Sequence, residues 1–191
     1  YKVSKQNTWN DLQLELQLVG GISIRKYTTS VSTEKTMPDQ EQLTNQNGKP
    51  VIPGTSWAGA IEHQIMKLLN EHDIQKIEGW KESFGYCLNG KKAKSKVRFS
   101  ESVIEGAKPK IISRNAIDRF TGGAASKALF TEKTFYGGKT FLKIEFAPDY
   151  KMNEKLVRAF AAAITDLHMG ILSVGGETSI GRGIFKITCI N

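Results

Sequence analysis

Alternating leucines near the start of the chain predict a first β-strand. Between residues 9 and 24, apolar and polar side chains alternate, which places one face of a strand on a core and the other face outward. The inner face carries Leu12, Leu14, Leu16 and Leu18. Residues 26–49 are polar, with hardly any apolar side chain, so we expect a long mobile loop there. Loops of this length inside a compact domain are usually functional or disordered, which makes this segment a candidate functional element.

Two later segments carry apolar residues at helical spacing. The first helix is expected to begin with Thr55 or Ser56 as its cap. Its apolar face consists of Trp57, Ile61, Ile65, Leu68 and Leu69. A weaker helical segment follows at about residues 73–82. The second clear helix spans residues 152–169, begins near the capping residue Asn153 and ends at Gly170.

The remaining segments predict strands and complete a recognisable order. Residues 96–104 alternate like a strand, and three extended segments follow at about residues 111–119, 128–135 and 140–146. Glycine pairs separate these three segments, which predicts a long hairpin that leads into a third strand. Residues 184–190 form the closing strand. The order is β-α-β-β-α-β, so the expected fold is α+β and ferredoxin-like, the order that RNA-recognition modules also use.

Length and composition narrow the class of protein. The 191 residues are expected to form one domain, residues 1–191, because this length buries a single sizeable core. No apolar run reaches the roughly 20 residues of a membrane span, and the first residues lack a signal peptide, so we expect a cytoplasmic protein with no membrane partner. Cys87 and Cys189 lie far apart without metal-ligand spacing, which favours buried free thiols over a disulfide or ligands.

Positive charge is concentrated in the middle of the chain. The net charge is +8, and residues 91–143 contain 13 Lys and Arg against 4 Asp and Glu. This regional excess points to a polyanionic partner such as nucleic acid. For the lysine-rich residues 91–96 alone, a solvated loop is an equally good interpretation.

Residues 175–183 form a glycine-rich segment between the second helix and the closing strand. Four glycines surround Thr178, Ser179 and Arg182, giving a backbone that can approach a ligand closely and present its N–H groups, as a phosphate would require. A simple turn is the alternative interpretation of the same pattern.

Several sequence blocks resemble one family. Residues 48–60, GKPVIPGTSWAGA, resemble the G-x-P-x-I-P-G-[ST]-S-x-x-G signature of the Cas-seven-type backbone subunits in the RAMP superfamily of CRISPR proteins. Residues 84–85 with 95–100, and residues 116–124, resemble the next two blocks of that family. The glycine-rich segment resembles the loop that follows the second helix in the superfamily. These four ordered blocks cover most of the chain.

The resemblance implies a repeating backbone subunit of a type III, or type III-derived, effector complex. Such a subunit binds guide (CRISPR) RNA, holds the duplex of guide and target RNA, and assembles in a filament with copies of itself and with other CRISPR effector subunits. The helix start and the glycine-rich loop would hold the guide backbone without reading its sequence. The RNA-binding residues that the resemblance and the charge pattern imply are Pro53, Gly54, Thr55, Ser56, Lys96, Arg98, Arg119, Phe120, Lys127, Lys133, Gly175, Gly176, Thr178, Ser179, Gly181, Arg182 and Gly183.

The hairpin at about residues 111–138 resembles the family's thumb, which reaches over a neighbouring subunit and wedges into the guide–target duplex. The candidate wedges are Phe120, Phe130 and Phe135, because an exposed aromatic ring can replace base stacking at a kink. Arg119, Lys127 and Lys133 would neutralise phosphates beside them. A place in the core is the alternative for each aromatic residue.

Asp39 is the candidate catalytic residue. Family members that cut target RNA carry an aspartate in a D-x-P-V-x-R-D-x-x-G pattern before the signature, and Asp39 gives the best match. A carboxylate there would bind Mg²⁺ or another divalent ion, or assist deprotonation of a ribose 2′-hydroxyl. Glu41, Thr44 and Asn45 replace the other residues of the pattern, and Glu62 stands where the family often has a basic residue. A solvated loop residue, in a scaffold that does not cut, is the alternative for Asp39.

Two other functions remain open from the sequence. A stand-alone guide-processing endoribonuclease of the same superfamily would use a histidine as general acid–base. The candidates are His63, His72 and His168, for which surface or capping roles are the alternative. A ferredoxin-like protein that binds another nucleic acid is the third possibility.

Overall fold

The computed structural model describes residues 9–26, 38–70, 74, 77, 79–88, 91–123 and 129–191. Its core is a four-stranded antiparallel sheet in the order β12-β1-β11-β7. The strands are β1 (Asn10–Val19), β7 (Val97–Phe99), β11 (Lys139–Phe146) and β12 (Ile184–Ile190), and the helices are α1 (Gly54–Leu69) and α4 (Glu154–Met169). Chain order and strand order together are those of a ferredoxin-like fold, which confirms the predicted fold class.

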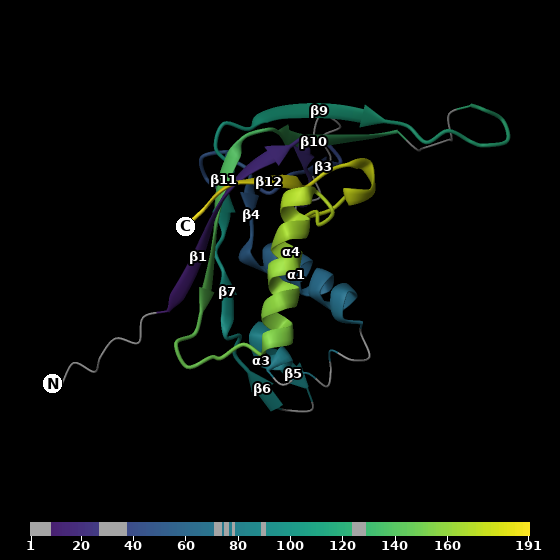
Figure 1. Cartoon of the computed structure of the whole chain (residues 1–191). Helices are drawn as coiled ribbons and strands as arrows, with labels where there is room; N and C mark the ends of the chain where they lie inside the picture. The colour runs from purple at the N-terminus through teal and green to yellow at the C-terminus, as the bar shows by residue number, and fades with distance from the viewer. Residues whose placement is uncertain are drawn as a thin grey trace.

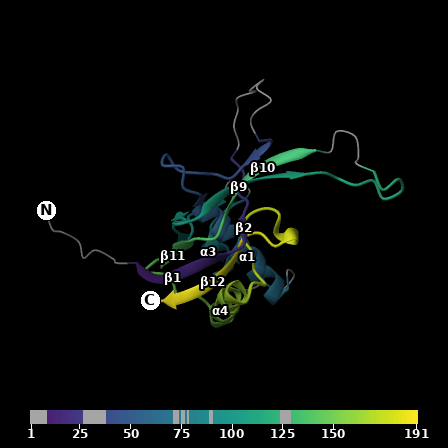
Figure 2. The same cartoon turned by 90° about the horizontal axis from the view of Figure 1, so that it is seen from above.

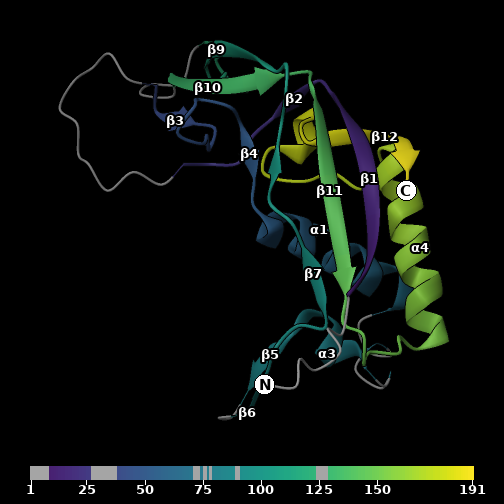
Figure 3. The same cartoon turned by 90° about the vertical axis from the view of Figure 1, so that its left-hand side faces the viewer.

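Both long helices lie on the same side of this sheet, as Figure 3 shows. The inward face of β1 consists of Leu14, Leu16 and Leu18, all buried, so the leucine alternation predicts the core face correctly. Trp57 of α1 packs against Phe185 of β12 with ring centroids 5.2 Å apart, and its Nε1 donates to Ser102 Oγ at 3.0 Å. Apolar packing between helix and sheet therefore defines the core. Within the described residues, no helix is long and apolar enough to cross a membrane.

The two helices begin in different ways. The side chain of Asn153 accepts a hydrogen bond from Lys155 N at 3.0 Å, and α4 ends at Gly170, as predicted; Gly170 has a left-handed conformation. The predicted cap of α1 is wrong: Pro53 is the cap residue, and Thr55 and Ser56 lie in the first turn. A proline in extended conformation directs the chain into the helix, and Gly54 lets the helix start pass close to the backbone of β7.

The middle of the chain departs in detail from the predicted elements. The strand expected at residues 96–104 is two strands, because β7 pairs with β11 whereas β8 (Ser102–Val103) pairs with β4 (Val51–Ile52). The weak helix expected at residues 73–82 lies partly outside the described residues, and a short helix, α3 (Trp80–Phe84), follows Gly79. Next come β5 (Tyr86–Leu88) and β6 (Lys91–Ala93), which pair as a small hairpin.

A second sheet lies across one end of the core. Its long hairpin consists of β9 (Lys108–Arg114) and β10 (Phe130–Tyr136), which stay in antiparallel register from Arg114–Phe130 to Lys108–Tyr136. Two short strands, β2 (Gly21–Ile22) and β3 (Gln40–Glu41), also pair with β10. The hairpin extends well beyond the rest of the molecule in both views (Figures 1 and 2). The predicted hairpin insertion is therefore present.

The segment predicted as a long loop contains defined backbone in its second half. Residues 27–37 lie outside the described residues, whereas β3 pairs in parallel with β10. Gln42 is buried: its Oε1 accepts from Ile24 N at 2.6 Å and its Nε2 donates to Val51 O at 3.1 Å. This side chain ties the described end of the segment to Ile24, which follows β2, and to Val51 of β4.

Two glycines of α1 differ in what surrounds them, and this gives a matched test. An added Cβ at Gly54 would collide with the carbonyl oxygen of Phe99, whereas at Gly59 it would meet nothing within 4 Å. We expect Gly54→Ala to lower the free energy of unfolding by about 1–3 kcal/mol through overpacking. We expect Gly59→Ala to raise it by up to about 1 kcal/mol, because alanine favours helix. Urea unfolding followed by circular dichroism measures both, and equal stability of the two variants would contradict the packing role of Gly54.

Candidate nucleic-acid interface

A surface groove of about 500 Å³ lies between the first turns of α1 and the chain that leaves α4. It brings together two segments predicted separately from the sequence, the helix start and the glycine-rich loop. The groove is lined by Thr55, Ser56, Gly59, Ala60, His63, Gln64, Lys67, Ile171, Leu172, Ser173, Gly175 and Thr178.

The chemistry of this groove suits a polyanion. The first backbone N–H groups of a helix have no acceptor within the helix and carry partial positive charge. Hydroxyl groups of Thr55, Ser56 and Thr178 lie beside them, and exposed Lys67 and His63 continue along the same face of α1. Neither residue is among the RNA contacts expected from the sequence, from which His63 is a candidate catalytic group. His63 and Lys67 are four residues apart and therefore lie on the same face of the helix, a sequence feature that could have identified them as neighbours in one binding surface.

Glu62 directly precedes His63, one of the residues that line the groove. It is partly buried, and the loss of hydration raises the pKa of its carboxyl above the usual value. Gln64, the buried polar residue on the same helix, also lines the groove, and it donates to Asp166 Oδ2 of α4 at 2.7 Å, which joins the two helices.

The glycines of the loop divide into packed and open positions. Gly175 has a positive φ of 99°, and an added Cβ would lie 2.7 Å from Ser23 O; at Gly183 it would collide with Val174 O. Gly176 N donates to Ser23 O at 2.7 Å. Gly181 also has a positive φ, but open space surrounds it. The packed glycines hold the loop against the core, whereas the tip, Thr178 to Gly181, is exposed; Gly175 and Thr178 line the groove.

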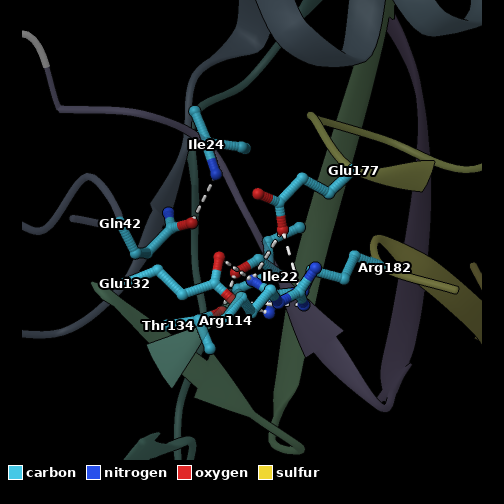
Figure 4. Close-up of polar contacts among 8 residues, drawn as sticks. All are labelled: Ile22, Ile24, Gln42, Arg114, Glu132, Thr134, Glu177 and Arg182. Atoms are coloured by element: carbon cyan, nitrogen blue, oxygen red, sulfur yellow. Dashed lines mark hydrogen bonds and ion pairs between the residues drawn. The ribbon is translucent and has the colours of Figure 1, made fainter. Parts of the chain in front are cut away.

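Arg182 does not belong to the ligand-facing surface, which corrects the prediction. Its side chain is only 3% exposed and makes a two-pronged contact with Glu132 of β10, with Nη1 donating to Oε2 at 3.0 Å and Nη2 to Oε1 (Figure 4). Glu177 Oε2 lies 3.1 Å from Arg182 Nη1, and Arg114 Nη2 lies 3.0 Å from Glu132 Oε1. We call these four residues the ion cluster. The guanidinium of Arg182, which the sequence predicts to bind phosphate, is instead paired with Glu132 and Glu177. The sequence pattern does not reveal this internal pairing.

Asp39 is hydrogen-bonded to Thr131 of the hairpin, the residue next to Glu132 of the ion cluster. Its Oδ2 accepts from Thr131 N at 2.7 Å and from Thr131 Oγ1 at 3.4 Å, while the residue itself is exposed. Lys133, on the other side of Glu132, is half-buried, and its carbonyl accepts from Gln42 N at 2.9 Å. In the part of the chain that the structure describes, no group of three His, Cys, Asp or Glu residues could hold a metal ion.

The aromatic residues of the hairpin have different environments. Phe120 is 100% exposed near the tip, where Asp118 Oδ1 accepts from Phe120 N at 2.7 Å and from Thr121 N at 3.2 Å. Phe135 is 6% exposed and belongs to the core, so its interpretation as a wedge is wrong. Phe130 is half-buried and Arg119 is exposed, whereas Lys127 lies outside the described residues. Phe120 is therefore the wedge candidate that the geometry supports.

Two predicted contacts lie away from the groove. Lys96 precedes β7, and Arg98 lies within it, paired with Glu145 near the end of β11 that lies farthest from the hairpin. Lys96 Nζ lies 2.6 Å from Asp149 Oδ2, a hydrogen bond that lowers the pKa of Asp149, and the Arg98 guanidinium lies 3.9 Å above the ring of Trp9. The structure does not bring these two residues together with the loop tip.

The other candidates from the sequence are placed as follows. His168 Nδ1 accepts from Ile187 N at 3.2 Å at the end of α4, and His72 lies outside the described residues. Cys87 and Cys189 are free thiols, as expected, but both are exposed rather than buried.

A family model described as the RAMP superfamily matches residues 19–186. A search of curated proteins found no match. One chain in the cryo-EM structure of the type III-B Cmr-beta bound to cognate target RNA superposes with a TM-score of 0.64 at 15% sequence identity. The superposition covers 96% of this chain and 60% of that chain, and at this identity it shows a shared fold.

The ion cluster leads us to expect that replacing two different glutamates by alanine will have very different effects on the free energy of unfolding. Glu132→Ala leaves the buried Arg182 without its main partner, and we expect a loss of about 3–5 kcal/mol in the free energy of unfolding. The control is Glu154→Ala, which breaks an exposed pair with Arg158 and should cost no more than about 0.5 kcal/mol. Chemical unfolding measures both, and a comparable loss in the two variants would contradict the buried pairing.

Proposed function

Because the chain belongs to the RAMP superfamily, we propose that it is a repeating backbone subunit of a type III CRISPR interference complex. It binds guide RNA along the groove, and its hairpin contacts the duplex of guide and target RNA. The observation that carries the proposal is the groove itself, in which the first turn of α1 and the glycine-rich loop face one space. Copies of itself along the guide and other effector subunits are its proposed partners.

The groove favours contact with an RNA backbone over recognition of bases. The polar part of its lining consists of hydroxyl residues, Gln64, a lysine and a histidine, which suit phosphate and ribose oxygens, and the apolar part consists of Ala60, Ile171 and Leu172. The nearest large aromatic of α1, Trp57, is fully buried and cannot stack on a base. Binding should therefore depend on salt and tolerate any guide sequence, as a subunit that repeats along a guide requires.

The hairpin supplies the proposed contact with the duplex. Phe120 offers an exposed ring, and the neighbouring Arg119 offers a charge for a phosphate. Both lie on an arm that extends beyond the ferredoxin-like core, so they reach a duplex held alongside the subunit (Figure 2).

Target cleavage through Asp39 is part of the proposal. Both hydrogen bonds from Thr131 go to Oδ2, so the hairpin holds the carboxylate in place while the residue stays exposed. A carboxylate held in this way can take the proton of a ribose 2′-hydroxyl. Mg²⁺ at this position would use Asp39 as its protein ligand and take its remaining ligands from RNA oxygens and water. Cleavage would then recur once per subunit.

One prediction of the proposed function concerns RNA binding in the groove. Lys67→Ala is expected to weaken guide binding about equally for unrelated sequences and to reduce the slope of log affinity against log salt by about 0.7, the loss of one phosphate contact. Lys155→Ala, which removes an exposed lysine near the start of α4, is the matched control and should leave the slope unchanged. Filter binding at several salt concentrations measures both.

Two results would contradict this view of the groove. Equal slopes for wild type and Lys67→Ala would remove the lysine from the RNA path. Cutting of a guide precursor by the chain alone, lost in His63→Ala, would instead favour the guide-processing endoribonuclease, because His63 lines the groove.

The second prediction separates catalysis by Asp39 from anchoring. Asp39→Asn keeps an oxygen that accepts from Thr131 N but removes the charge, whereas Asp39→Ala removes both. In complexes assembled on guide RNA with Mg²⁺ and labelled complementary RNA, we expect both variants to lose at least about 10²-fold in cleavage rate and to retain target binding. Wild-type cleavage in Asp39→Asn would leave Asp39 with the anchoring role alone.

A further inference from the structure

Four ionised side chains meet where the glycine-rich loop packs against the hairpin. Arg114 comes from β9, Glu132 from β10, and Glu177 and Arg182 flank the tip of the glycine-rich loop, as Figure 4 shows. The side chains of Glu132 and Arg182 are each 3% exposed, that of Glu177 is 18% exposed and that of Arg114 is 31% exposed. The ion cluster thus bridges two segments that are about 50 residues apart in the sequence and that have separate proposed RNA contacts.

The geometry of the ion cluster is better suited to fixing the orientation of the loop relative to β10 than to stabilising the fold. A buried ion pair stabilises a fold no better than apolar side chains of equal volume, because both charges lose their hydration. The planar guanidinium of Arg182, however, contacts both oxygens of Glu132 and so fixes angle as well as distance. Glu177 adopts a left-handed backbone with a φ of 59°, which non-glycine residues rarely adopt, while its carboxylate reaches Arg182.

The two ends of this bridge lead to different RNA contacts. From Glu177 and Arg182, the loop tip continues into the groove through Thr178. From Glu132, the strand continues to Thr131, which holds Asp39, and the hairpin continues to Phe120. A displacement of the loop tip would therefore disturb one of the contacts that hold β10, alongside its pairing with β2 and β3.

We propose that the ion cluster couples guide binding at the glycine-rich loop to the orientation of the hairpin and Asp39 for target RNA. Glu132, Arg182, Glu177 and Arg114 act as positioning residues, because their charges are used internally. This inference rests on the proposed function. Guide RNA that orders the loop tip would also order the hairpin, which prepares Phe120 and Asp39 for the target.

The first test measures orientation without RNA. Spin labels are placed at Ile117→Cys on the hairpin and Ser179→Cys on the loop tip, both exposed, with the exposed Cys87 and Cys189 changed to serine. Glu177→Gly removes the carboxylate and suits the left-handed backbone, so this variant should fold. Glu132→Gln is the second variant because it keeps the side-chain shape. Glu154→Gln, in an exposed pair on α4, is the control.

We expect one narrow distance distribution between the labels in wild type and in Glu154→Gln. Glu177→Gly and Glu132→Gln should give a broader distribution while circular dichroism shows folded protein. A cluster that only stabilises the fold would lower the unfolding temperature and leave the distribution unchanged, and that result overturns the proposal.

The second test uses unlabelled protein assembled on guide RNA. Glu177→Gly should lower affinity for target RNA by about tenfold, a usual size for coupling between two sites, and change guide affinity by less than about threefold. Phe120→Ala should cost less target affinity in Glu177→Gly than in wild type, because the ring is no longer held in position. Additive losses would overturn the coupling. Failure of the wild-type chain to bind guide RNA would overturn the proposed function, whereas the label distances decide separately whether the cluster orients the hairpin.

Discussion

The contact between Arg182 and Glu132 is the interaction on which the arrangement of the functional segments depends. Each side chain is almost completely buried, so separating them would leave a charge in a medium of low dielectric constant. The pair therefore fixes the loop after α4 against β10. Asp39 is attached to the same strand through Thr131, and Gln42 ties its segment to Ile24 and Val51. The glycine-rich loop and Asp39 are therefore both held against the hairpin, because each contacts its strand β10.

The ferredoxin-like core and the segments added at its end have different roles. The sheet β12-β1-β11-β7 and its two helices contain most of the buried apolar residues and hold the start of α1 and the end of α4 in place. The groove forms where the first turn of α1 and the chain leaving α4 are close together. The hairpin and β3 extend this end of the core. A fold that many unrelated proteins share thus acquires a specific proposed role through the segments attached to one end.

The glycines and the arginine of the motifs show why a motif alone does not assign a role. Gly54 and Gly183 permit close backbone approach to Phe99 and Val174, so packing within the protein requires them. Gly59 and Gly181 face open space. The same residue type in one motif therefore serves packing at one position and access for a ligand at another. Arg182, between two such glycines, turns inward to Glu132, although its neighbours at the loop tip are exposed.

The sequence by itself determined the order of elements, the leucine face of β1, the beginning and end of α4 and the presence of the hairpin, because these follow from local periodicity, capping and turn residues. Tertiary structure alone decided that Phe135 is buried while Phe120 is exposed, that Lys67 and His63 line the groove, and that Arg182 pairs internally. Each of these outcomes depends on which distant segment packs beside the residue. Local sequence patterns carry no information about that neighbour, since burial and charge pairing arise only when the sheets and helices meet.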